Sequence, residues 1–138
     1  LGICLGMQML LDNSTEHGQH TGLGLIPGTV IPIPNGRTEM GKKLRKVPHI
    51  GWSALRHPSH LSSWNGSCLD VTPPGTYCYF VHSYMVEPEI TSHVLAQCVY
   101  EGLPVIGAIR KENITGLQFH PERSGPVGLE ILRRFVTE

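Results

Sequence analysis

The sequence predicts an α/β fold, an open sheet with flanking helices, and three observations support this prediction. An apolar run at residues 1–3 leads directly into a helical pattern, four β-rich runs lie between residues 77 and 119, and an amphipathic pattern closes the chain. This order of elements is typical of α/β domains. A doubly wound sheet needs further βα units, and the chain opens inside an apolar run without a methionine. We therefore expect residues 1–138 to be the C-terminal part of a single domain that is incomplete at its N-terminus.

The first part of the chain alternates short regular elements with loops. Residues 1–3 are expected to end a strand, and residues 4–13 are expected to form a helix because their apolar side chains recur at helical spacing. Polar and glycine residues then predict a loop at 14–24. Two prolines and a glycine divide residues 25–33 into short extended pieces, with a strand expected at 29–32.

The middle of the chain carries weaker patterns. An Asn-Gly pair predicts a turn at 35–36, inside the polar stretch 35–46. Residues 47–52 predict a short strand and a turn. Residues 57–75 are rich in Ser, Pro, Gly and Asn, which predicts a connection on the surface.

The last part of the chain carries the clearest patterns. Short turn sequences separate four β-rich runs, so we expect antiparallel neighbours. The runs are residues 77–84, 93–100, 105–110 and 114–119, with turns at 87–88, 101–102 and 112–113. Apolar residues at spacing three then predict an amphipathic helix over 128–137.

Composition excludes several classes of function. The 138 residues are 40% hydrophobic and carry eleven basic against eleven acidic side chains. No apolar run approaches the roughly 18 residues that span a bilayer, and no basic stripe suggests nucleic acid. The four cysteines show no C-x-x-C spacing, so neither zinc nor a dithiol is indicated. We expect free thiols, a cytoplasmic location, no metal or cofactor, and a small molecule or a protein as partner.

Residues 2–6 read G-x-C-x-G between an apolar run and a helical pattern, which is the thiol form of a nucleophile elbow. The helix N-terminus is expected to favour the thiolate of Cys4, and the N–H of Leu5 is expected to face a developing oxyanion. A buried apolar cysteine between a strand and a helix is the alternative interpretation.

His120 and Glu122 end the last β-rich run, with Pro121 between them. Residues two apart in extended chain point to the same side, so Glu122 is expected to accept a hydrogen bond from one ring nitrogen while the other faces Cys4. A thiol nucleophile needs such an oriented imidazole base. A strand-end histidine beside a solvated glutamate is the alternative. His17 and His20 form an isolated H-x-x-H in a polar loop and do not indicate a metal site.

With these motifs in hand, the chain resembles the class I, triad-type glutamine amidotransferases: residues 2–8 resemble their nucleophile signature and residues 118–122 their base signature. Residues 22–28, 47–52 and 79–84 are similar to the glutaminase subunits of imidazole glycerol phosphate synthase. The resemblance runs over nearly the whole chain. It implies a class I glutamine amidotransferase-like open sheet and a role in histidine biosynthesis.

The resemblance also implies a mechanism and a partner. Cys4 would attack the side-chain amide of glutamine, His120 would protonate the leaving ammonia and then activate water, and Glu122 would orient the imidazole. Ammonia would pass to a (β/α)8 cyclase subunit that makes imidazole glycerol phosphate and AICAR. The residues that the motifs place on glutamine are Leu5, Gln8, His82, Ser83 and Tyr84. Those placed at the partner interface are Trp52, Tyr79 and His49, with core aromatics as the alternative for the first two and a structural role as the alternative for His49.

The chain also departs from the family pattern. Ser53 stands where the family usually has Asn, Met85 replaces a frequent aromatic, and Arg123 replaces a usual Lys. The stretches 35–46 and 57–74 look enlarged. A glycine-containing loop that supplies a second oxyanion donor would precede residue 1, and loss of one donor typically costs roughly a hundredfold to a thousandfold in rate. We therefore expect residues 1–138 alone to be poorly stable and essentially inactive.

Three other functions are considered. The chain could be a glutaminase that serves another acceptor enzyme, such as one that modifies a sugar. It could be a non-catalytic glutaminase-like binding domain, although the intact Cys4, His120 and Glu122 argue against this. A thiol or metal sensor is disfavoured by the cysteine spacing.

Overall fold

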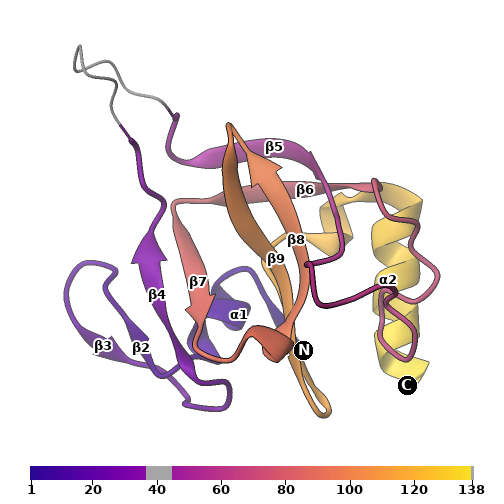
Figure 1. The fold of residues 1–138 in the computed structure, drawn as a ribbon, viewed down its shortest axis with the longest axis horizontal. Helices are drawn as coiled ribbons and strands as arrows, with labels where there is room; N and C mark the ends of the chain where they lie inside the picture. The colour runs from indigo at the N-terminus through magenta and orange to yellow at the C-terminus, as the bar shows by residue number, and fades with distance from the viewer. Residues whose placement is uncertain (37–44, 138) are drawn as a thin grey trace.

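A computed structural model describes residues 1–36 and 45–137 (Figure 1). In this part of the chain, one four-stranded mixed sheet has the order β1 (Gly2–Ile3), β10 (Ile114–Leu117), β9 (Leu103–Lys111), β8 (Val94–Tyr100). β1 runs parallel to β10, with Ile3 opposite Leu117, and the other neighbours are antiparallel. The parallel pair matters for the site, because chemistry in α/β sheets gathers at the carboxyl ends of parallel strands.

A second four-stranded sheet and a two-stranded ribbon complete the strands. One has the order β3 (His20–Thr21), β2 (Asn13–Ser14), β4 (Gly28–Pro32), β7 (Tyr84–Pro88). The other pairs β5 (His49–Ala54) with β6 (Tyr77–His82) in antiparallel register, Trp52 opposite Tyr79. Figure 1 shows β2, β3 and β4 at one side of the molecule and α2 (Gly125–Thr137) at the other, with the β8–β9 hairpin between them.

Besides α2, three helical segments connect these strands. α1 (Leu5–Met9) follows β1, and the short 3-10 turns η1 (Thr91–His93) and η2 (Pro121–Arg123) precede β8 and α2. No helix in the described ranges is long and apolar enough to cross a membrane.

Two clusters of buried side chains form the core. The first brings together the β5–β6 ribbon, the β8–β9 hairpin and α2, through residues that include Leu55, Phe80, Phe119 and Ile131. The second packs α1 against β4, β7 and β9, through Met7, Leu11, Val30, Val86 and Ile109. Burial on this scale contributes roughly 25 cal/mol per Å² of apolar surface, and it fixes α1 and β10 relative to each other.

The predicted α/β class is confirmed, as are the opening strand, the strand at 29–32 (β4) and the antiparallel neighbours β8, β9 and β10. The closing helix is also confirmed, although it begins at Gly125 and not at residue 128. The turns at 101–102 and 112–113 are present, with Glu101 and Glu112 at positive φ. The strand expected at 47–52 is β5, which begins and ends two residues later.

The helix expected over 4–13 is a correction, because α1 ends at Met9. The backbone carbonyl of Leu10 accepts the N–H groups of Leu25 and Ile26, and that of Leu11 accepts the N–H of Gly24. Tertiary hydrogen bonds therefore replace the next helical turn, and residues 13–14 become a strand. The predicted loop at 14–24 is also not wholly irregular, since it contains β3.

The run 77–84 is a second correction, because it divides at Ser83 into β6 and β7, which belong to different sheets. Neither strand is a neighbour of β8, so the antiparallel expectation fails there. The turn expected at 87–88 is also wrong: β7 continues through Pro88, which pairs with Gly28 at the end of the ladder.

The stretch 57–75 has no helix or strand, as predicted, but it is not confined to the surface. Trp64, Cys68 and Leu69 are buried in the first core cluster. The indole Nε1–H of Trp64 donates to the carbonyl of Leu95 at 2.8 Å. At residues 35–36, where a turn is expected, no helix or strand is present and Gly36 has a positive φ of 59°, whereas residues 37–44 of the stretch 35–46 lie outside the described part of the chain.

Candidate active site

Cys4 lies at the junction of β1 and α1 in a conformation that few residues adopt. Its φ is 51° and its ψ is −107°, a strained region for a residue with a side chain. Its N–H donates to the carbonyl of Leu117 at 2.7 Å, which ties the turn to the end of β10. A Cβ atom at Gly2 would lie 2.5 Å from the carbonyl oxygen of Gly6. The tight strand-to-helix turn therefore requires glycine at residue 2, as the elbow motif predicts.

The sulfur of Cys4 is partly buried among polar groups. Its S–H donates to the carbonyl of Val81 at 3.7 Å, and Nε2 of Gln118 donates to Sγ at 3.7 Å. Burial raises the pKa of the thiol. The N–H of Leu5 and the amide of Gln118 act in the opposite direction, whereas the charges of Glu122 and Glu16 add to the increase in pKa.

The expected effect of the helix N-terminus on Cys4 is seen in the N–H of Leu5, which lowers the pKa, but it does not prevail. α1 has only five residues, so few peptide dipoles add at its start, and burial outweighs the hydrogen bond from Leu5. The net increase in pKa favours the thiol form. A reaction at this sulfur needs a base to take the proton.

His120 and Glu122 form the predicted hydrogen bond, with Nδ1 of the imidazole 2.7 Å from Oε1 of the carboxylate. The contact is made across a turn and not along extended chain, because Pro121–Arg123 form η2 directly after His120. The hydroxyl of Ser124 donates to the carbonyl of His120 at 2.7 Å and closes this turn. Since a carboxylate only accepts, Nδ1 carries the proton and Nε2 is left as the basic nitrogen.

Cys4 and His120 reach the same edge of β6. The N–H of His120 donates to the carbonyl of Tyr79 at 2.8 Å, and the Cys4 thiol contacts the carbonyl of Val81. Residues two apart in a strand lie roughly 7 Å apart. The parallel strands β1 and β10 thus bring the thiol of Cys4 and the backbone of His120 to neighbouring carbonyl groups of a third strand.

Gln118 is a site residue that sequence reasoning missed as an individual position. Its side chain is 0% exposed and connects Cys4 to Gln8, whose Nε2 donates to Oε1 of Gln118 at 3.2 Å. Nε2 of Gln8 also donates to the carbonyl of Tyr84 at 3.1 Å. A polar residue inside an otherwise apolar strand pattern, two positions before the base, is the signal in the sequence.

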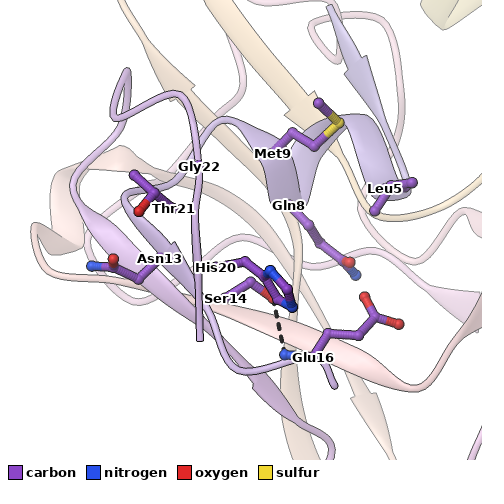
Figure 2. Close-up of a pocket in the computed structure, with 9 residues that line it drawn as sticks. All are labelled: Leu5, Gln8, Met9, Asn13, Ser14, Glu16, His20, Thr21 and Gly22. Carbon is purple, nitrogen blue, oxygen red and sulfur yellow. Dashed lines mark hydrogen bonds between the residues drawn. The ribbon is translucent and has the colours of Figure 1, made fainter. Parts of the chain in front are cut away.

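A surface depression beside the sulfur collects the residues expected to bind glutamine. It is lined by Cys4, Leu5, Gln8, Glu16, His82, Ser83 and Tyr84. A second depression shares Leu5, Gln8 and Glu16 and extends to the β2–β3 hairpin (Figure 2). The structure therefore brings all five predicted glutamine-binding residues to one place.

Glu16 is the second site residue that the sequence did not identify. It lies in the polar stretch between α1 and β4, and Figure 2 shows its carboxylate extended toward the amide of Gln8. Its N–H donates to the hydroxyl of Ser14 at 3.2 Å, which fixes the loop. No pattern in this polar stretch distinguishes Glu16 from an ordinary solvated side chain.

His82, which lines the depression, and His49 form a buried pair. Nδ1 of His82 lies 2.7 Å from the carbonyl of Tyr84, Nε2 of His82 lies 2.9 Å from Nδ1 of His49, and Nε2 of His49 lies 2.9 Å from Oγ of Ser53. Because the Tyr84 carbonyl only accepts, each ring has one possible tautomer, with its proton on Nδ1. Burial lowers the pKa of both histidines to about 4.

The three residues expected at a partner interface lie in different environments. His49 is 1% exposed, stacked between Phe80 and Tyr100 with ring centroids 4.9 and 3.9 Å away. Its side chain belongs to the interior and presents no surface to a partner. Trp52 is 54% exposed, so the core alternative is wrong for it, and Tyr79 is half-buried.

Trp52 and Tyr79 form an exposed aromatic patch on the outer face of β5 and β6. Their rings meet edge to face at 5.9 Å, and the guanidinium of Arg123 lies 4.4 Å from the centre of the Tyr79 ring. Ile50 and Tyr77 extend the patch and are also exposed. Among the described residues, no group of three or more His, Cys, Asp or Glu side chains is arranged to hold a metal ion.

Comparison with known proteins gives a consistent result. The family model "Glutamine amidotransferase class-I" matches residues 1–138. The chain is 46% identical over 136 residues to the imidazole glycerol phosphate synthase subunit HisH 1 of Legionella pneumophila (strain Lens), covering 99% of this chain and 63% of that protein. It is 48% identical over 136 residues to subunit HisH of Geobacillus thermodenitrificans, covering 99% and 60%.

Solved structures agree on the fold. The crystal structure of a glutamine amidotransferase from Thermotoga maritima matches with a TM-score of 0.55 and 20% identity, covering 99% of this chain and 44% of that chain. The present chain spans about three fifths of the length of the curated relatives it matches.

Proposed function

Because the chain belongs to the class-I glutamine amidotransferase family, we propose that it carries a glutaminase site that hydrolyses glutamine to glutamate and ammonia. The observation that carries the proposal is that Cys4, in a strained turn, and His120, whose ring is oriented by Glu122, contact neighbouring carbonyl groups on the same edge of β6, Cys4 through its thiol and His120 through its backbone N–H. A base is required there because burial keeps Cys4 protonated at rest.

The reaction would proceed in two stages. Nε2 of His120 takes the proton from Cys4 as Sγ attacks the amide carbon of glutamine, and the N–H of Leu5 stabilises the oxyanion. The imidazolium then gives its proton to the departing nitrogen, so ammonia leaves and a glutamyl thioester remains. His120 next takes a proton from water, which attacks the thioester, and Cys4 departs with a proton from His120. Glu122 holds Nδ1–H and stabilises the imidazolium.

The depression suits the charged end of glutamine. Both hydrogens of the Gln8 amide group are engaged by Tyr84 and Gln118, which leaves its carbonyl oxygen Oε1 to accept from a ligand. The carboxylate of Glu16 lies on the same wall and would pair with the α-ammonium group. Ser83 and Tyr84 also line this depression.

We further propose that the ammonia passes to a (β/α)8 cyclase subunit in a heterodimer that makes imidazole glycerol phosphate and AICAR for histidine biosynthesis. The printed names of the curated relatives support this partner. The exposed patch of Trp52 and Tyr79, adjacent to Val81 and hence to Cys4, offers a surface for it. Four free thiols are compatible with a cytoplasmic location.

The proposal is tested with the protein at its natural length. A diazoketone analogue of glutamine should label Cys4, as detected by peptide mass spectrometry, and excess glutamine should protect it. The variant Cys4→Ser should remain unlabelled. Labelling at Cys68 or Cys78 in place of Cys4 would refute the nucleophile assignment. Copurification with a sugar-modifying enzyme and not with the cyclase would favour another acceptor.

A further inference from the structure

The amide of Gln118 has one possible orientation. Its Oε1 accepts a hydrogen from Gln8, so its Nε2 faces the sulfur of Cys4. The amide of Gln8 is fixed in turn by the carbonyl of Tyr84. If Gln118 were flipped, its NH₂ group would meet the NH₂ group of Gln8, and its carbonyl oxygen would face Sγ. The two amides therefore act as one unit that presents an N–H to the nucleophile.

The position of Gln118 makes this donor rigid. Its side chain is completely buried, so water cannot take its place, and a hydrogen bond to a charged group is strong when solvent is excluded. The preceding residue, Leu117, accepts the N–H of Cys4 at 2.7 Å. The end of β10 thus holds both the backbone and the sulfur of the nucleophile.

The charges around Cys4 create a need for such a donor. Glu16 and Glu122 both oppose a negative charge on the sulfur, although both have roles in the proposed reaction. In the hydrolysis proposed above, a thiolate exists once His120 has taken the proton. A fixed N–H directed at Sγ stabilises that state without reorganisation.

From this geometry we infer that Gln118 is a further catalytic residue, which binds the sulfur of Cys4 as a thiolate, and that Gln8 positions it in addition to contacting the substrate. The inference rests on the proposed function for its place in the reaction. The contact with the sulfur can be tested without any turnover of glutamine.

The test measures the pH dependence of Cys4 alkylation by iodoacetamide, in the protein at its natural length, by mass spectrometry of the Cys4 peptide. Gln118→Met keeps the length of the side chain and removes the donor. Loss of a hydrogen bond to a charged group should move the alkylation midpoint upward by about one pH unit and lower the thiolate population at pH 7 about tenfold.

Thr115→Val is the matched control, because Thr115 is buried on β10, the strand that leads into Gln118, and is not one of the residues that line the depression. It should leave the midpoint unchanged. If Gln118→Met has the same alkylation midpoint as this control, and thermal unfolding shows that the variant is folded, the inference is wrong. If Gln118→Met does not fold, Gln118→Glu decides: it keeps an acceptor for Gln8 and puts an anion at the sulfur, so the midpoint should rise further.

Glutamine kinetics separate this inference from the proposed function. In Gln118→Met, kcat should fall about tenfold with KM nearly unchanged, because Gln118 does not line the depression. A shifted alkylation midpoint in a protein that never hydrolyses glutamine would support the contact and refute the glutaminase. Normal hydrolysis of glutamine with an unshifted alkylation midpoint in Gln118→Met would support the glutaminase and refute the contact between Gln118 and the sulfur.

Discussion

Acidification from pH 7 to pH 5 should destabilise the fold through His49 and His82. Both rings are buried and neutral, and each nitrogen is engaged in the chain from Tyr84 to Ser53. Protonation of His82 would place its new N–H against the Nδ1–H of His49, and protonation of His49 would reverse its hydrogen bond with the hydroxyl of Ser53. Burial is the first cause of the low pKa of both groups, and a positive charge on His82 lowers the pKa of His49 further.

The sign and size of the effect follow from linkage. The pKa of each ring is about 4 in the folded protein, against 6.5 for the ordinary group. The unfolded chain therefore binds more protons between these values, and stability falls as the pH falls through 6.5 and levels off near 4. At pH 5 the loss is about 2 kcal/mol per histidine, and at most about 4 kcal/mol for the pair.

Urea unfolding of the protein at its natural length, at pH 5, 6 and 7, measures this loss. His49→Phe retains an aromatic ring between Phe80 and Tyr100 and removes one titrating group. Its free energy of unfolding at pH 7 should be about 1–3 kcal/mol lower than that of the wild type, since His82 and Ser53 lose a partner. Between pH 7 and pH 5, however, this variant should lose about 2 kcal/mol less stability than the wild type, because one titrating group is gone.

His60→Gln, at an exposed position, is the control and should show the wild-type loss. If His49→Phe and the wild type lose the same free energy of unfolding between pH 7 and pH 5, the reasoning is refuted. That result would mean that the ring of His49 is hydrated or already charged in the folded protein.

Three further predictions concern the site in the protein at its natural length. Gly2→Ala should cost at least about 2 kcal/mol in urea unfolding, because its Cβ would collide with the carbonyl of Gly6; an unchanged midpoint would contradict the tight turn. Glu122→Gln should lower kcat about a hundredfold or more by disturbing the tautomer of His120, and a loss below threefold would contradict its role. Glu16→Gln should raise KM for glutamine about tenfold while leaving labelling of Cys4 by iodoacetamide intact, and an unchanged KM would exclude an ammonium contact.

Much of the fold was accessible from local patterns. The apolar run before Cys4, the β-rich runs after residue 93 and the spacing of Leu129, Leu132 and Phe135 predicted elements that the structure contains. Such patterns work where one side of an element is buried by its immediate neighbours. They failed at residues 10–13, where hydrogen bonds from residues 24–26 end the helix. They also failed at Ser83, where one β-rich run divides into two strands that belong to different sheets.

The sequence by itself determined which groups carry the proposed chemistry: a cysteine in a glycine-flanked turn, and a histidine two residues before a glutamate. Only the tertiary structure decided the state of these groups. The pKa of Cys4 depends on burial and on charges from Glu16 and Glu122, and the orientation of Gln118 depends on Gln8, which is 110 residues away in sequence. His49 likewise matches an interface motif but is buried. Desolvation and hydrogen-bond direction arise between segments that only folding brings together, so no local spacing encodes them.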